Sequence, residues 1–170
     1  PQAYDIIENT LDQSLDLLDK PDSALFFLRK AWAESIRAGY HQGVAKATGI
    51  IALVHYENQN LDSAINYFRR SLLYRQQHDL SKSGIAGMYT WLGNTYGDKN
   101  MFARSIANLK EALVIRQELG VPNRLADAHS DLAIAYSDFA ISNIDIQESN
   151  SILSAQNQAT FHFKKSLSFL

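Results

Sequence analysis

The residue types that most often carry out chemistry are scattered along this sequence of 170 residues. The five histidines show neither the H-E-x-x-H pattern nor the spacing of paired metal ligands. The chain has no cysteine, which excludes disulfides, thiolate metal sites and a cysteine nucleophile. A G-x-x-x-x-G-K phosphate loop, a G-x-G-x-x-G fingerprint and a G-x-S-x-G elbow are absent as well. We therefore expect a protein that is not an enzyme and that holds no metal or cofactor.

One histidine has acidic neighbours along the chain. His129 stands between Asp127 and Asp131, which makes a weak candidate for a cation site. A histidine packed among its neighbours is the more common origin of such a pattern. We assign no metal there.

Composition narrows the class of partner. Apolar residues make up 46% of the chain and charged residues 20%, and the formal net charge is −2, all ordinary for a globular protein. A nucleic-acid binder would show a basic surplus, so we expect no nucleic-acid partner. No apolar run approaches the roughly 18 residues of a membrane span, so we expect no direct membrane insertion of this segment.

The sequence repeats itself with a step of 40 or 41 residues, and this repeat predicts the architecture. One register aligns Ala24, Ala64 and Ser105; Leu28, Phe68 and Leu109; Ala31, Ser71 and Ala112; and Trp32, Leu72 and Leu113. A second register aligns Ile51, Leu92 and Leu132, and then Ala52, Gly93 and Ala133. Because two registers share one period, we infer consecutive copies of one structural unit.

Each unit is predicted to contain two α-helices. The spacings between Ala64, Phe68 and Ser71 place these side chains on one helical face. Polar segments rich in turn residues separate the helices. The candidate N-caps are Asp22, Asn60, Ser81, Asn100 and Asn123. We expect an all-α fold of eight helices at about 2–19, 22–38, 42–58, 61–77, 82–98, 102–119, 123–140 and 152–169.

The units are predicted to form a single array. Their approximate bounds are 2–38, 42–77, 82–119 and 123–169. The last unit contains an insertion at about 141–154, which we interpret as a surface loop or a helix extension.

The third unit carries Leu92-Gly93-x-x-Tyr96, followed by Asn100-x-Phe102-x-x-Ser105-x-x-x-Leu109-x-x-Ala112-Leu113. These residues resemble the tetratricopeptide repeat. The second unit matches less fully, and the fourth keeps Leu132-Ala133-x-x-Tyr136. The period exceeds the common 34 residues. The phrase SKSGIAGMYTWLGNTY is similar to the long-period variant found in bacterial signalling proteins such as sensor histidine kinases.

The resemblance implies a right-handed superhelical array of antiparallel helix pairs, an α-solenoid whose first helices line a concave face. Such arrays hold peptides or partner proteins in their groove. The family's groove positions correspond here to candidate binding residues Lys46, Leu53, Tyr56, Glu57, Thr90, Asn94, Asp98, Asp127, Ser130, Ile134 and Asp138.

Charge is sorted between the two kinds of helix. The four first helices hold ten acidic residues against three basic ones, and the second helices hold eleven basic residues against five acidic ones. An acidic groove would favour a cationic or polar peptide and speed its encounter. Ion pairs between helices, or plain solvation of the charges, are the alternative.

The leading functional hypothesis is a non-catalytic protein- or peptide-binding module, the sensory or scaffolding part of a larger bacterial signalling protein. The alternative is a structural role, in which the apolar C-terminal helix forms a homodimer. A regulator that acts on a separate enzyme is a third possibility. The module would be cytoplasmic, or extracytoplasmic if it is the sensor part of a membrane kinase.

Overall fold

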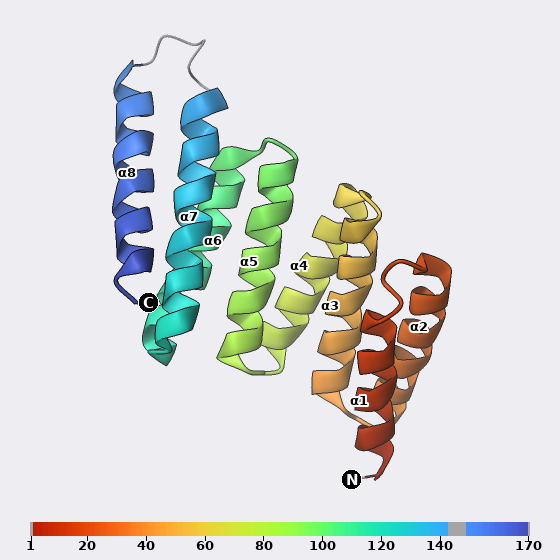
Figure 1. The fold of residues 1–170 in the computed structure, drawn as a ribbon. Coiled ribbons are helices and arrows are strands. Elements are labelled where there is room, and N and C mark those ends of the chain that lie inside the picture. The colour runs from red at the N-terminus through yellow and green to blue at the C-terminus, as the bar shows by residue number, and fades with distance from the viewer. Residues whose placement is uncertain (1, 143–148, 170) are drawn as a thin grey trace. The chain divides into compact units, whose positions relative to one another are not determined.

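The computed structural model describes residues 2–142 and 149–169, and all regular secondary structure in these stretches is α-helical. The helices are α1 (Gln2–Leu15), α2 (Pro21–Arg37), α3 (His41–Glu57), α4 (Leu61–Gln77), α5 (Lys82–Asp98), α6 (Phe102–Leu119), α7 (Pro122–Ser142) and α8 (Ser149–Leu167) (Figure 1). The expected all-α fold is thereby confirmed.

The helix bounds differ from the expected ones mainly at the two ends of the chain. Helix α1 ends at Leu15, whereas the sequence suggested a helix to residue 19. Helix α7 continues to Ser142 and α8 begins at Ser149, so both flanks of the predicted insertion at 141–154 are helical. Residues 143–148 of that insertion lie outside the described residues.

The same turn closes four successive helices. Gly39, Gln59, Asp79 and Asn100 all have positive φ, between 48° and 64°. The residue after each donates its backbone N–H to a carbonyl five residues earlier; for example, Asn60 donates to His55 at 2.8 Å. This is the Schellman pattern, which satisfies the last carbonyls of a helix. The recurrence at these four helix ends shows the repeat in the backbone itself.

The contacts divide the chain into two compact units, Pro1–Met88 and Tyr89–Leu170. The boundary falls inside α5, so its first half belongs to unit 1 and its second half to unit 2.

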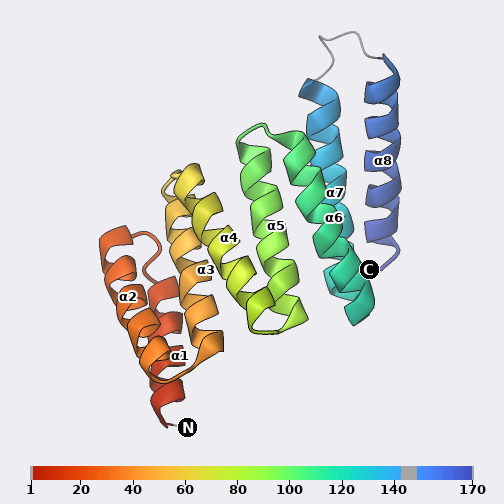
Figure 2. The same cartoon turned by 180° about the vertical axis from the view of Figure 1, so that it is seen from behind.

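In unit 1, α3 contacts α1, α2 and α4 and thus forms the centre of the packing. Helices α1 and α3 lie on one side of the unit, and α2 and α4 lie on the other (Figure 1, Figure 2). The core contains Ile7, Leu11, Leu28, Ala24, Ala31, Ala47 and Val54. The small residues permit close approach of the helices, and the Ser71 hydroxyl ties α4 to α3 by donating to the Ala45 carbonyl at 2.7 Å.

In unit 2, α7 packs between α6 and α8. Leu109, Leu132 and Tyr136 are at the centre of this core. The second half of α5 approaches α6 closely, because a Cβ atom at Gly93 would lie 2.6 Å from Cγ of Leu109. Only glycine fits at that point without displacing a buried leucine.

Candidate functional site

One face of α7 carries an exposed stripe of predicted binding residues. Asp127, Ile134 and Asp138 are all exposed, and Ile134 leaves 58% of its surface open to solvent. Their spacing of seven and then four residues puts them on one side of the helix. Ser130 is half-buried beside them. We call Asp127, Ile134 and Asp138 the α7 stripe.

The acidic residues of α7 are partly neutralised by arginines. The Asp131 carboxylate lies 3.8 Å from Nη1 of Arg116, and the Asp127 carboxylate lies 3.8 Å from Nη1 of Arg124. Arg116 also donates to the Thr90 hydroxyl at 3.0 Å and to the Arg124 carbonyl at 3.4 Å. It therefore connects α5, α6 and α7, and predicted site residue Thr90 belongs to this structural network.

Burial dominates the electrostatics of this network. Burial lowers the pKa of Arg116, although the carboxylates of Asp131 and Asp127 act in the opposite direction. Burial likewise raises the pKa of Asp131 despite the nearby Arg116 guanidinium. Both groups have lost hydration that their mutual attraction only partly restores.

The predicted residues on α5 are placed differently. The Asn94 side chain is half-buried and has no hydrogen-bond partner among residues 2–142 and 149–169. Asp98 is exposed and forms no ion pair within the same described residues. Asn94 can therefore offer its amide donor and acceptor to a ligand.

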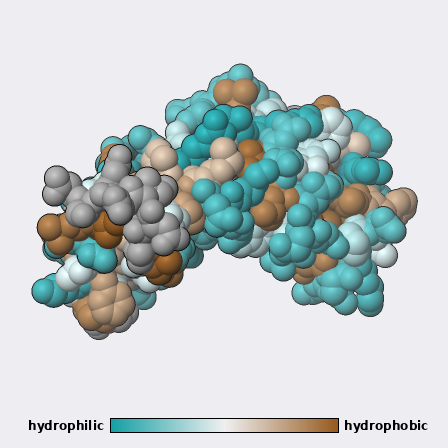
Figure 3. Space-filling model, turned by 90° about the horizontal axis from the view of Figure 1, so that it is seen from above, coloured by the Kyte–Doolittle hydropathy of each residue, from teal (hydrophilic) through white to brown (hydrophobic). Residues whose placement is uncertain are grey.

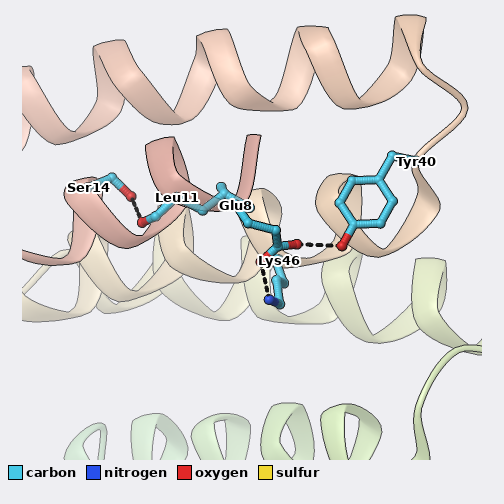
Figure 4. Close-up of polar contacts among 5 residues, drawn as sticks. All are labelled: Glu8, Leu11, Ser14, Tyr40 and Lys46. Atoms are coloured by element: carbon cyan, nitrogen blue, oxygen red, sulfur yellow. Dashed lines mark hydrogen bonds and ion pairs between the residues drawn. The ribbon is translucent and has the colours of Figure 1, made fainter. Parts of the chain in front are cut away.

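The predicted residues on α3 divide into one with a structural role and three others. Lys46 forms an ion pair with Glu8, whose other carboxylate oxygen accepts a hydrogen bond from the Tyr40 hydroxyl at 2.5 Å (Figure 4). These contacts join α1 to α3, so Lys46 stabilises the packing of unit 1. Leu53 and Tyr56 are half-buried, and Glu57 is exposed.

The Glu8 cluster shifts its own ionisation. Burial would raise the pKa of Glu8, but the hydrogen bonds from Lys46 and Tyr40 outweigh burial and leave this pKa below its ordinary value. Burial and the Glu8 carboxylate together raise the pKa of Tyr40 to about 12. On the same helix, the Ser14 hydroxyl donates to the Leu11 carbonyl at 2.6 Å (Figure 4).

A small cavity lies between α2 and α4, with α3 as its floor. Its volume is about 180 Å³, and Trp32, His55 and Tyr67 contribute aromatic walls. Arg29 and Arg70 stand at its exposed edge. The His55 ring stacks on Tyr67 with 5.2 Å between centroids, and burial together with Arg29 lowers the pKa of His55.

Two features escaped the sequence analysis. His129 and His162 are buried and share a hydrogen bond of 2.7 Å between their Nδ1 atoms. This contact joins α7 to α8 across 33 residues, and no local sequence motif predicts it. Arg75 and Arg116 are both buried, and they stand 41 residues apart, which is the repeat step. Their spacing could have marked them as equivalent.

Within residues 2–142 and 149–169, no group of three or more histidine and acidic side chains is arranged to hold a metal ion. The described helices include none that is both long and apolar enough to cross a membrane.

Comparison with known proteins agrees with this fold. Residues 86–118 match the family model described as tetratricopeptide repeat. No curated protein matches the chain. Among solved structures, the chain is similar to BtubC (BKLC) from P. vanneervenii, with a TM-score of 0.71 and 19% sequence identity over 89% of this chain and 57% of that one. This chain thus spans little more than half the length of that protein, and the likeness concerns the fold alone.

The matched stretch contains the Leu92-Gly93-x-x-Tyr96 and Ser105-x-x-x-Leu109 residues that pack α5 against α6. A family match at these residues and a helical repeat fold over most of the chain support the same conclusion. Residues 86–118 of this chain therefore match a tetratricopeptide repeat, within a helical repeat fold.

Proposed function

We propose that the chain is a non-catalytic module that binds a protein or peptide through the α7 stripe and Asn94. Tetratricopeptide repeats typically act as non-catalytic protein-interaction modules. The observation that carries the proposal is Ile134, a large apolar side chain that is 58% exposed between two exposed acidic residues. An apolar anchor with a polar rim is the usual composition of a binding surface.

The roles of the individual side chains follow from their chemistry. Ile134 would bury apolar surface of the partner, and Asp138 would attract a basic residue beside it. The amide of Asn94 could donate to and accept from an extended peptide backbone. Asp127 already faces Arg124, so its contribution to a cationic partner would be smaller.

The wider context remains part of the proposal. The likeness of SKSGIAGMYTWLGNTY to long-period repeats supports a sensory or scaffolding part of a larger bacterial signalling protein. The excess of acidic residues in the first helices supports a cationic or polar peptide as the partner.

A peptide-array experiment tests the proposal. Purified protein is offered immobilised peptides of graded charge, and affinities of the bound ones are measured by calorimetry for the original chain and for Ile134→Ser. We expect cationic peptides with an apolar residue to bind, and Ile134→Ser to weaken them about tenfold or more.

The matched control is Val114→Ser. Val114 on α6 is 51% exposed and lies outside the α7 stripe, so its loss should leave affinity unchanged. Equal affinity of Ile134→Ser and Val114→Ser would contradict the proposed surface.

A structural role is the second candidate, and exposed apolar side chains on α8 favour it. Leu153, Phe161, Phe163 and Leu167 are each more than half exposed. In the space-filling view, hydrophobic patches interrupt a mostly hydrophilic surface (Figure 3). Sedimentation of the same samples separates the two candidates, because homodimerisation through α8 would persist in Ile134→Ser and would depend on concentration.

A further inference from the structure

Arg75 is a buried cation that meets no counter-ion among the residues that the structure describes. It lies in the last turn of α4, and only 5% of its surface is exposed. Its Nε atom has no hydrogen-bond partner, and its guanidinium forms no ion pair or hydrogen bond within the described stretches of the chain. Asp79, four residues further along, is exposed and does not pair with it. A buried charge of this kind costs stability until an anion meets it.

The guanidinium lies against the first turn of α5. A Cβ atom at Gly84 would collide with Nη1 of Arg75 and would stand 3.1 Å from its Cζ. Gly84 is the third residue of α5, so the absence of a side chain there lets the arginine reach the helix end.

That helix end carries unused donors. The first hydrogen bond inside α5 runs from Ile85 N–H to the Ser81 carbonyl at 3.1 Å. The N–H groups of Ser83 and Gly84 have no acceptor among the residues that the structure describes. The start of a helix bears partial positive charge, which stabilises an anion and opposes a cation. An anion beside the first turn of α5 would therefore be stabilised by both the Arg75 guanidinium and the N–H groups of the helix end.

The neighbouring repeat contains that negative charge. Arg116, the equivalent of Arg75 one repeat step later, is paired with Asp131 and donates to Thr90. The negative charge of Asp127 also stabilises the charged form of Arg116.

The corresponding positions in the earlier repeat hold no acid. Leu92 aligns with Leu132, so Gly87 and Trp91 stand where α7 has Asp127 and Asp131. The step of 41 residues, which relates α3 to α5, aligns Gly49 with Thr90. Every side chain that satisfies Arg116 is thus replaced by one that cannot accept a hydrogen bond from Arg75.

We propose that Arg75 and the N-terminal turn of α5 form a binding site for a carboxylate, supplied by an acidic residue of a polar peptide. The peptide source of the carboxylate rests on the proposed function. The ligand would complete in trans the ion pair that Asp131 completes within the chain. Because Lys82 and Ser83 are exposed, the site opens to solvent at the helix end.

The charge balance favours a carboxylate over a phosphate. One buried guanidinium is neutralised by one negative charge, whereas a phosphate monoester carries about two at neutral pH. The carboxylate of Asp131 in the equivalent position is the precedent in this chain.

The test follows NMR signals at the site. The Nε–H of Arg75 and the amide N–H of Ser83 and Gly84 are monitored while sodium acetate replaces sodium chloride at constant ionic strength. A second titration uses N-acetyl-Gly-Glu-Gly-amide, a third its glutamine counterpart, and a fourth inorganic phosphate. We expect saturable shifts with acetate and the glutamate peptide, and none with the glutamine peptide.

A matched pair of variants makes the test specific. A Cβ atom at Gly87 would meet no atom within 4 Å, so both Gly87→Asp and Gly87→Asn fit the fold. Gly87→Asp supplies an internal carboxylate at the position of Asp127. It should weaken acetate about tenfold or more, whereas Gly87→Asn should leave acetate binding unchanged.

Each other outcome contradicts the proposal. Absence of saturable shifts with both carboxylates, or equal binding by the two Gly87 variants, would remove the site. Tighter binding of phosphate would overturn the choice of carboxylate. If acetate bound and the glutamate peptide did not, a peptide would be ruled out as the source of the carboxylate. Failure of the α7 stripe would show instead in Ile134→Ser, which should not change acetate binding at Arg75.

Discussion

The hydrogen bond between His129 and His162 requires one ring to keep an unprotonated Nδ1, because one Nδ1 donates and the other accepts. Their rings also stack with 5.0 Å between centroids, and the Phe169 ring stacks on His129. Burial, helped by the neighbouring His129 and Lys110, lowers the pKa of His162 to about 4, and burial with Lys165 lowers the pKa of His129. The hydrogen bond that joins α7 to α8 is lost once both rings are protonated.

The pair predicts acid lability of unit 2. The histidine pKa is 6.5 in the unfolded chain, which therefore binds protons more tightly than the folded chain. The contribution of the pair to the free energy of unfolding is thus fully present above about pH 6.5 and is lost as the pH falls toward 4. The loss should approach about 1.4 kcal/mol per pH unit for each histidine that titrates. Urea unfolding at several pH values measures it.

The control for this prediction is an exposed histidine. His162→Gln should flatten the pH dependence between 6.5 and 4, whereas His78→Gln, at an exposed position, should not. An unchanged slope in His162→Gln would show that other groups cause the acid sensitivity.

At the scale of the helices, two of the four glycines of α5, Gly87 and Gly93, have opposite surroundings. A Cβ at Gly93 would lie 2.6 Å from Cγ of Leu109 and 3.2 Å from the Ser105 carbonyl, whereas one at Gly87 would meet open space. Gly93 permits the contact of α5 with α6, and Gly87 permits nothing of the kind.

This contrast predicts opposite effects of the same substitution. Gly93→Ala should destabilise the chain by about 1–3 kcal/mol, because Leu109 is 2% exposed and cannot move aside. Gly87→Ala should stabilise it by up to about 1 kcal/mol through helix propensity. Denaturant midpoints measure both, and a Gly93→Ala chain as stable as the original would show that the helices can separate at no cost.

The helices were the part of the structure that the sequence predicted best. Helices α4, α5 and α6 begin and end at the expected residues, because apolar periodicity and turn residues are local signals. Asn60 is the N-cap, as expected, and accepts from the Ser63 N–H at 3.4 Å. The expectation for Asn100 was wrong: it has φ of 57° in the preceding turn, and Met101 is the N-cap. The expectations for Asp22 and Asn123 were wrong as well, because both residues lie inside helices. Asparagine is favoured in both positions, so its presence alone could not decide.

The candidate site was less predictable, because charge pairing depends on partners distant in sequence. The sorting of acids and bases left open whether they face solvent or one another. Lys46 and Glu8, separated by 38 residues, form an ion pair, and Arg116 meets Asp131. Ile134 and Asp138, on the other hand, are exposed as a binding role requires. The rotation of each helix about its own axis decides whether a charged residue faces solvent or a neighbouring helix. The spacing of apolar residues predicts this rotation only approximately.

At the scale of the whole molecule, each of the two units has a core of its own. Leu28 lies fully buried in the core of unit 1, and Leu132 lies fully buried in that of unit 2. In repeat proteins stability is approximately a sum over units and their neighbours, so unfolding need not be all-or-none.

Selective destabilisation tests this expectation. Leu132→Ala should cost about 2–5 kcal/mol and speed native-state hydrogen exchange in α7 while α3 keeps its protection. Leu28→Ala should do the reverse. Simultaneous loss of protection in α3 and α7 with either variant would indicate one cooperative unit.

The position of the unit boundary inside α5 has a consequence for recombination. Repeats in the sequence end between helices, just before Lys82, whereas the first unit uses α5 as far as Met88. Met88 reaches back to α3, where a Cβ at Gly49 would lie 3.5 Å from its Sδ, and Gly84 covers Arg75. An exchange of whole repeats, cut just before Lys82, would replace the first half of α5 and so remove the residues that cover unit 1. A transplantable module should therefore extend past the end of the sequence repeat to Met88, because a crossover in the middle of α5 falls at the boundary between the two units.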